Sequence, residues 1–146
     1  MVRLFIISIF FICSMAAKGQ QIPSAIEKKL VDLPGTYIGK MPCADCSGIE
    51  TTLTLQCDSL CRGGRYMRID KYLNTKNGDQ SNKIKGRWGL VDQNNLTEHS
   101  IVFIALYVED TAKVGVYELK KDGNLLPVDK DMHKIEAKMD ITLKKL

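Results

Sequence analysis

The chain has 146 residues, of which 45% are hydrophobic and 26% are charged, and its formal net charge is +4. This length suits a single domain, and the apolar content excludes both a large multidomain enzyme and a disordered polar chain. The basic residues are spread along the chain without the dense block that tracks nucleic acid, so we expect no nucleic-acid partner.

Residues 1–19 have the pattern of a secretory signal peptide. Arg3 supplies the positive charge, residues 4–12 are almost wholly apolar, and Ala17 and Gly19 are the small residues that precede a cleavage site. The apolar run is too short for a transmembrane helix, which needs about 20 residues. The sequence therefore predicts an exported protein of the periplasm or cell envelope.

The alternative for this segment is an outer-membrane lipoprotein in which the thiol of Cys13 is lipidated. Against this alternative, Ile12 occupies the position where a small residue is expected, and the apolar run before Cys13 is short.

Residues 20–34 form a lead-in to the domain. Ile22, Ile26 and Leu30 have helical spacing, with Ser24 as a candidate cap and Pro34 as a stop, which predicts a short helix or an ordered arm. After Pro34 the apolar period changes from 3.6 to 2, so we expect residues 35–146 to form one β-domain.

Eight β-rich runs separated by turn residues follow the lead-in. The last is the clearest, because five apolar residues from Ile135 to Leu143 alternate strictly with polar ones, as in an antiparallel strand with one buried face. About eight strands in this length predict an all-β fold, a small antiparallel barrel or sandwich. The candidate strands cover residues 36–40, 49–56, 65–72, 83–90, 100–108, 113–120, 125–128 and 135–144.

After the leader, four cysteines remain: Cys43, Cys46, Cys57 and Cys61. An even number of cysteines in an exported protein predicts two disulfides, but it leaves their connectivity open. Local pairs are possible, and so are cross-pairs, because a strand over residues 49–56 lies between the two clusters.

The Cys43-x-x-Cys46 motif allows several chemistries besides a structural disulfide. It can form a redox pair, although a strand rather than the helix of a thioredoxin follows it. Four thiolates can close a structural zinc site. Two thiolates can also hold one Cu(I), and Met41 adds a thioether two positions earlier, which makes the three residues a candidate soft-metal site.

The residues around this motif form a longer pattern: Tyr37-x-Gly39, Pro42-Cys43-Ala44-Asp45-Cys46 and Gly48-Ile49-x-Thr51-x-Leu53, followed by Gly86-Arg87-Trp88 and Asp122-Gly123-Asn124. This pattern resembles the N-terminal domain of the NlpE family of copper-resistance and envelope-stress lipoproteins, and Cys43 and Cys46 occupy the family's Cys-x-x-Cys positions. The resemblance implies a lipocalin-like antiparallel β-barrel at the bacterial envelope, with roles in copper tolerance, surface sensing and signalling to an envelope-stress sensor kinase. We interpret the chain as a single-domain form, because it ends before the second, OB-like domain of this family.

We therefore predict a non-enzymatic envelope protein linked to copper homeostasis and envelope-stress sensing, with copper as its one candidate cofactor. Its expected partner is an envelope-stress sensor or another envelope protein. The alternative is a lipocalin-like carrier of an apolar small molecule with purely structural disulfides. Trp88 is expected to pack at one end of the barrel, and His99 and His133 are expected at the surface.

Overall fold

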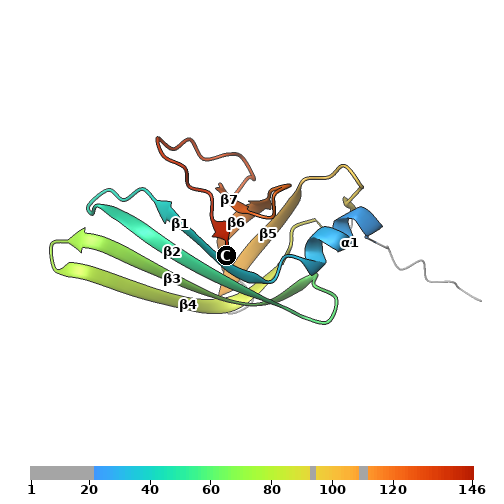
Figure 1. Cartoon of the computed structure of the whole chain (residues 1–146), viewed down its shortest axis with the longest axis horizontal. Coiled ribbons are helices and arrows are strands. Elements are labelled where there is room, and N and C mark those ends of the chain that lie inside the picture. The colour runs from blue at the N-terminus through green and yellow to red at the C-terminus, as the bar shows by residue number, and fades with distance from the viewer. Residues whose placement is uncertain (1–21, 93–94, 109–111) are drawn as a thin grey trace, which may run out of the picture.

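The chain folds into one eight-stranded antiparallel sheet that curves into a nearly closed barrel (Figure 1). The computed structural model describes residues 22–92, 95–108 and 112–146, so the predicted signal peptide and Cys13 lie outside the described residues. The predicted all-β barrel is confirmed. The elements are α1 (Ser24–Val31), β1 (Gly35–Met41), β2 (Gly48–Cys57), β3 (Gly63–Thr75), β4 (Gly78–Leu90), β5 (Val102–Val108), β6 (Ala112–Leu119), β7 (Leu125–Val128) and β8 (Lys144–Lys145).

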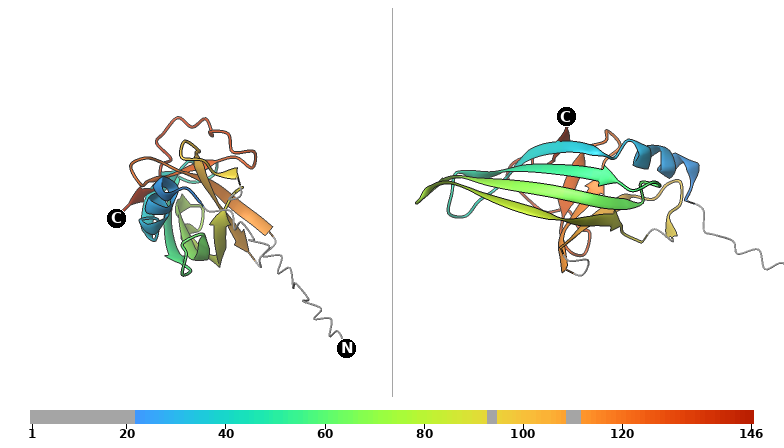
Figure 2. Two further views of the ribbon diagram at one scale, coloured as in Figure 1. Left: turned by 90° about the vertical axis from the view of Figure 1, so that its right-hand side faces the viewer. Right: turned by 90° about the horizontal axis from the view of Figure 1, so that it is seen from below.

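Strands β1 to β6 each pair with the next strand in the sequence, whereas β8 pairs with β1, so the order in the sheet is β7-β6-β5-β4-β3-β2-β1-β8. Strands β3 and β4 have 13 residues each and pair along most of their length, which makes them longer than the sequence pattern predicts. Because β4 pairs with β5 only from Arg87 to Leu90, the β3–β4 hairpin extends beyond the barrel (Figures 1 and 2). None of the helices in the described ranges is long and apolar enough to cross a membrane.

The apolar core fills the end of the barrel that α1 covers. Alternating strand residues such as Leu53 and Leu106 point inward with no exposed surface, and Ile26 and Leu30 of α1 pack against them. Trp88 lies in this core as predicted, 2% exposed, and its Nε1 donates a hydrogen bond of 2.9 Å to the carbonyl oxygen of Gln56. Burial of these side chains is the main source of stability for the fold.

Tyr37 connects α1 to the barrel. Its side chain is fully buried, and its hydroxyl donates a 2.6 Å hydrogen bond to the carbonyl oxygen of Leu33. Burial raises the pKa of Tyr37 to about 12. Lys145 lies over the ring, with Nζ 5.9 Å from its centroid, and donates a hydrogen bond to the carbonyl oxygen of Asp32. The C-terminal segment is thereby fixed to the end of α1 and to β1.

The two edges of the sheet meet through a short C-terminal segment. Lys144 and Lys145 pair with Ile38 and Tyr37 of β1. On the other side, the N–H of Leu125 donates to the carbonyl oxygen of Leu143 at 3.0 Å, and the N–H of Leu143 donates to that of Leu125 at 2.8 Å. This reciprocal pair joins β7 to the C-terminal segment and closes the barrel.

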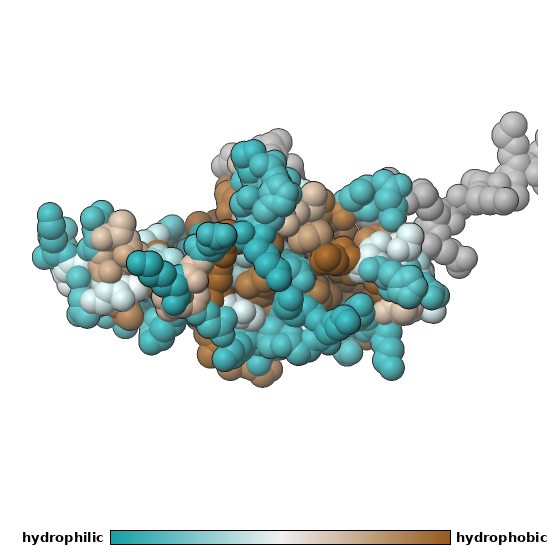
Figure 3. All heavy atoms as spheres, turned by 90° about the horizontal axis from the view of Figure 1, so that it is seen from above, coloured by the Kyte–Doolittle hydropathy of each residue, from teal (hydrophilic) through white to brown (hydrophobic). Residues whose placement is uncertain are grey.

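The predicted strand over residues 135–144 is wrong for most of its length, because only Lys144 and Lys145 form a strand. Ile135 and Met139 are 46% and 41% exposed, whereas Leu143 is fully buried. Figure 3 looks onto this side of the molecule, where hydrophobic residues show between hydrophilic ones in the middle of the face.

Local hydrogen bonds explain why the alternating segment does not pair. The Asp129 carboxylate accepts from the N–H groups of Asp131 and His133, and the Asp140 carboxylate accepts from the N–H of Thr142. Such turns compete with a strand ladder for the backbone. In addition, β7 has only four residues and includes Pro127, which has no N–H to donate.

Two substitutions in the C-terminal segment test whether residues 135–143 form a regular strand. Leu143→Ala is expected to lower the free energy of unfolding by about 2–5 kcal/mol, because it leaves a cavity beside the barrel closure. Met139→Ala, which a regular strand would place on the same face, is expected to change it by less than about 0.5 kcal/mol. Urea unfolding of both oxidised variants checks this, and equal losses would indicate a regular strand.

The Tyr37 hydroxyl makes stability depend on alkaline pH. Because its pKa is raised to about 12 in the folded chain, from about 10 in the unfolded chain, the folded state holds this proton more tightly. The contribution of this proton to the free energy of unfolding is complete below about pH 10 and is lost as the pH rises through about 12. Tyr37→Phe should therefore show a shallower loss of stability between these pH values in urea unfolding. Equal slopes in the two proteins would contradict this role.

Candidate functional site

The loop between β1 and β2, residues 42–47, carries the first cysteine pair. Cys43 and Cys46 form a disulfide with their Cα atoms 5.4 Å apart, and both side chains are half-buried. Pro42, which lacks an N–H, follows the last paired residue of β1, and Gly48 begins β2 with a φ of +149° that other residues rarely adopt. Pro42 therefore ends β1 and Gly48 begins β2, and the half-buried pair lies on the tight loop between them.

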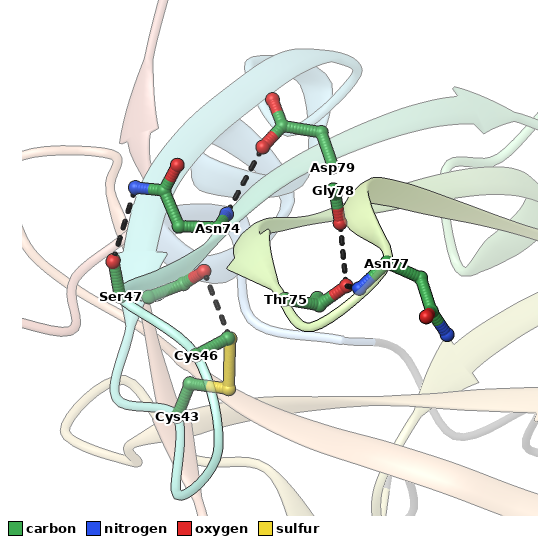
Figure 4. The surroundings of a disulfide bond; sticks show 9 residues. Cys43, Cys46, Ser47, Asn74, Thr75, Asn77, Gly78 and Asp79 are labelled. Atoms are coloured by element: carbon green, nitrogen blue, oxygen red, sulfur yellow. Dashed lines mark hydrogen bonds between the residues drawn. A yellow bond between two sulfur atoms is a disulfide. The ribbon is translucent and has the colours of Figure 1, made fainter.

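The tip of the β3–β4 hairpin supports this loop (Figure 4). The N–H of Ser47 donates to the carbonyl oxygen of Leu73 at 2.9 Å, and the Asn74 side-chain amide donates to the Ser47 hydroxyl at 3.1 Å. Asp79 accepts from the N–H of Asn74 and lies 3.0 Å from Nζ of Lys71. The Asn74 N–H and Lys71 together lower the pKa of Asp79. The hairpin thus holds the disulfide loop in place.

An open pocket of about 600 Å³ lies between the loop and the hairpin and includes both cysteines among its lining residues. Met41, the third candidate ligand, lines a different pocket of about 240 Å³ on the inner side of the sheet. The two pockets share Ile49 and Tyr72, which pair across β2 and β3. The structure therefore brings Cys43 and Cys46 together and places Met41 in the adjoining pocket.

Chemically, the pair can supply two sulfur ligands once it is reduced. Sγ of Cys46 lies 3.3 Å from the carbonyl oxygen of Gly48, which can accept a hydrogen bond from the thiol. In the described ranges, no cluster of three or more His, Cys, Asp or Glu side chains has the arrangement of a metal site. Two sulfur ligands suit a soft, low-coordinate metal such as Cu(I).

The second disulfide joins Cys57 and Cys61 at the opposite end of β2, with their Cα atoms 4.7 Å apart. Because β2 has ten residues, the two clusters are about 30 Å apart, which excludes the cross-pairs that the sequence left open. Both residues pack against the core, and the N–H of Asp58 donates to the carbonyl oxygen of Gly63 in the same turn. This disulfide stabilises the β2–β3 turn beside the α1 end.

Both histidines lie at the surface, as predicted. His99 is exposed and lines a charged pocket near Lys29 and Glu118. His133 is exposed in the C-terminal segment, where its N–H donates to Asp129. Neither lines the cysteine pocket.

A buried polar cluster lies inside the barrel, at the end away from α1. Asp70 is 4% exposed, and its carboxylate accepts from the Thr51 hydroxyl at 2.7 Å and from Nε of Arg68 at 2.8 Å. Nη2 of Arg68 lies 2.8 Å from the same carboxylate. Burial opposes the Arg68 charge, but Tyr117 and Asp70 raise the pKa of Arg68 above its ordinary value. The Arg68 guanidinium therefore keeps its charge inside the barrel.

The motifs of the sequence do not point to this cluster. The signal that could have found it is the period of β3, which places Arg68 and Asp70 on the same inward face as Tyr66 and Tyr72. Two opposite charges at inward positions of one strand indicate a buried ion pair, because neither charge is stable there alone.

Known proteins are similar to this chain in sequence and in fold. Residues 37–138 match the family model of the NlpE N-terminal domain. Lipoprotein NlpE of Escherichia coli strain K12 is 27% identical over 140 residues, which cover 94% of this chain and 52% of that protein. The chain thus spans about half the length of this relative.

Two solved structures are similar to the chain. A candidate lipoprotein from Shewanella oneidensis superposes with a TM-score of 0.57 and 28% identity, and the match covers 78% of this chain and 89% of that one. The Cpx pathway activator NlpE from Escherichia coli superposes with a TM-score of 0.54 and 27% identity, covering 77% of this chain and 51% of that one.

Two aspartates on the β3–β4 hairpin allow a matched test of the buried ion pair. Asp70→Asn is expected to lower the free energy of unfolding by about 3 kcal/mol, the lower end of the range for breaking a buried pair, because the Arg68 side chain keeps 21% exposure. Asp79→Asn removes a solvated ion pair and should leave the urea midpoint nearly unchanged. Equal effects would show that Asp70 is solvated.

Proposed function

The chain belongs to the family of the NlpE N-terminal domain, and from this membership we propose that it is a non-enzymatic protein of the bacterial cell envelope that acts in copper handling and envelope-stress sensing. The observation that carries the proposal is the Cys43–Cys46 pair in an open pocket of a family barrel. The relatives described as lipoproteins support a place in the envelope, and the one described as a Cpx pathway activator supports an envelope-stress sensor as the partner.

Copper binding at this pair requires reduction of the disulfide. A dithiol reductant breaks the S–S bond by thiol–disulfide exchange, so that Cys43 and Cys46 gain two electrons and two protons while the reductant is oxidised to its own disulfide. A Cu(I) ion then displaces the two thiol protons, because the thiolate is the ligand. The same pair is thereby both the metal ligand set and a redox-sensitive element.

The position of the pair favours it over the other cysteines. Cys43 and Cys46 line an open pocket, and the β3–β4 hairpin fixes their loop through Ser47 and Asn74. Cys57 and Cys61 pack against the core in the turn beside α1. We therefore assign metal binding to the first pair and a structural role to the second.

Met41 is a candidate third ligand. It lies two residues before Cys43 at the end of β1 and lines the pocket next to that of the cysteines. A thioether is a soft ligand that suits Cu(I), so a contribution from Met41 would tighten binding without adding charge.

The alternative function, a carrier of an apolar small molecule, is not supported by the way the described residues pack. The interior beside α1 is filled by side chains with no exposed surface, among them Tyr37, Leu53 and Leu106. The pocket at the other end of the interior contains a buried ion pair, which does not suit a purely apolar ligand.

A competitive Cu(I) titration of the fully reduced protein against a Cu(I) chelator tests the proposal. We expect one Cu(I) per chain, and Cys43→Ser/Cys46→Ser should weaken binding by more than roughly 100-fold, since even groups behind the ligands contribute about 10–100-fold. The matched control is Cys57→Ser/Cys61→Ser, which should bind Cu(I) like the unmodified protein.

Equal affinities of the two double variants would overturn the assignment to Cys43 and Cys46. A Met41→Leu variant keeps the size of the side chain and removes only the thioether. Weaker binding by this variant would make Met41 a ligand, whereas unchanged binding would leave a two-sulfur site.

A further inference from the structure

The β3–β4 hairpin contains an irregularity beside the cysteine loop. The register of the two strands shifts between Tyr72 and Thr75. There Leu73 and Asn74 of β3 lie opposite a single residue of β4, Asp79. Such a β-bulge interrupts the ladder and often redirects a side chain next to a functional site.

Asn74 adopts a backbone conformation that most residues with a side chain avoid. Its φ is +52°, in the left-handed region that Asn tolerates better than other residues do. Asn74 has no paired residue in β4, and its N–H donates instead to the Asp79 carboxylate at 3.0 Å. The bulge thereby leaves the side-chain amide of Asn74 available for a contact outside the hairpin.

That contact is with the cysteine loop. Nδ2 of Asn74 donates to the Ser47 hydroxyl at 3.1 Å (Figure 4), and the N–H of Ser47 donates to the carbonyl oxygen of Leu73 at 2.9 Å. Ser47 directly follows Cys46 in the sequence, so both hydrogen bonds fix the residue next to one sulfur atom of the disulfide. The two bulge residues therefore hold one end of the loop that carries the disulfide.

We propose that Asn74 is a positioning residue that shifts the Cys43–Cys46 pair toward its disulfide form by holding Ser47. The Asn74–Ser47 hydrogen bond forms more readily when the disulfide has already closed the loop, because a reduced loop must first lose conformational freedom. Coupling between two such events is reciprocal, so the hydrogen bond favours disulfide formation by the same factor. The meaning of this control for Cu(I) capture rests on the function proposed above.

The disulfide equilibrium of this pair can be measured without copper. In exchange with oxidised glutathione, the S–S bond between Cys43 and Cys46 forms and the S–S bond of glutathione breaks. Two electrons and the two thiol protons pass from the cysteines to two molecules of reduced glutathione. Because the glutathione ratio at half-reduction reports this equilibrium alone, failure of this test and failure of the Cu(I) titration are distinguishable.

Asn74→Gly tests the side-chain hydrogen bond, since glycine adopts the left-handed conformation freely and keeps the bulge. The equilibrium constant for disulfide formation at Cys43–Cys46 should fall about threefold, within the roughly two- to tenfold that one neutral hydrogen bond contributes. Ser47→Ala removes the other partner and should have the same effect, and the double variant should show no further loss. Differential thiol labelling and mass spectrometry measure each pair separately after proteolysis at Glu50, which lies between the two pairs.

The Cys57–Cys61 pair of the same molecule is an internal control, because it lies at the opposite end of β2 and its equilibrium should stay unchanged in every variant. Ser81→Ala is the matched control for Ser47→Ala, since Ser81 is an exposed residue of β4 that does not line the cysteine pocket. An unchanged equilibrium of the first pair in both single variants would overturn the proposal. Additive effects in the double variant, or equal shifts at both cysteine pairs, would overturn it as well.

Discussion

Closure of the barrel depends on the C-terminal segment, where Leu125 and Leu143 exchange a reciprocal pair of backbone hydrogen bonds and Val128 forms a second bridge with Lys134. The sheet is otherwise a simple meander, in which each strand pairs with the one before it. Once the C-terminal segment joins β7 to β1, the inner faces of the first and last strands are held opposite each other. That constraint brings Arg68 of β3 to Tyr117 of β6 and creates the interior pocket. Lys145 extends the same closure to α1 through the carbonyl of Asp32.

Strand β2 runs between two ends of the barrel that differ in chemistry. At the α1 end, the Cys57–Cys61 disulfide lies against a densely filled apolar core. At the other end, the Cys43–Cys46 loop faces an open pocket, and a buried ion pair lies on the inner side of the sheet. The cross-strand pair of Ile49 and Tyr72 lines both this pocket and the one beside the ion pair. One end of the barrel is therefore a filled apolar core, and the other carries the candidate cysteine site and the buried ion pair.

Much of the fold could be predicted because alternation along a strand reports which face is buried. Inward positions such as Leu53 and Trp88 follow directly from period 2. Alternation does not report whether a pairing partner exists, so it failed for residues 135–144, where local turns at Asp129 and Asp140 engage the backbone. The Cys-x-x-Cys motif predicted where the first cysteine pair lies in the sequence. The distance between the two pairs depends on the length of β2 and did not follow from the motif. The Arg68–Asp70 pair carries no motif, and its neighbours Thr51 and Tyr117 are brought together only by the fold.

The buried ion pair at the end of the interior away from α1 does not add to the stability of the fold in the way that apolar residues do. A buried ion pair is generally no more stabilising than apolar residues of similar volume, since both charges must leave water. At the α1 end, the same strands bury apolar residues only, so this sheet can form a fully apolar core. The buried Tyr66 hydroxyl, which has no hydrogen-bond partner among the described residues, adds a separate cost elsewhere on β3. The α1 end therefore supplies most of the stability of the fold, and the ion pair at the other end adds little that apolar residues of similar volume would not.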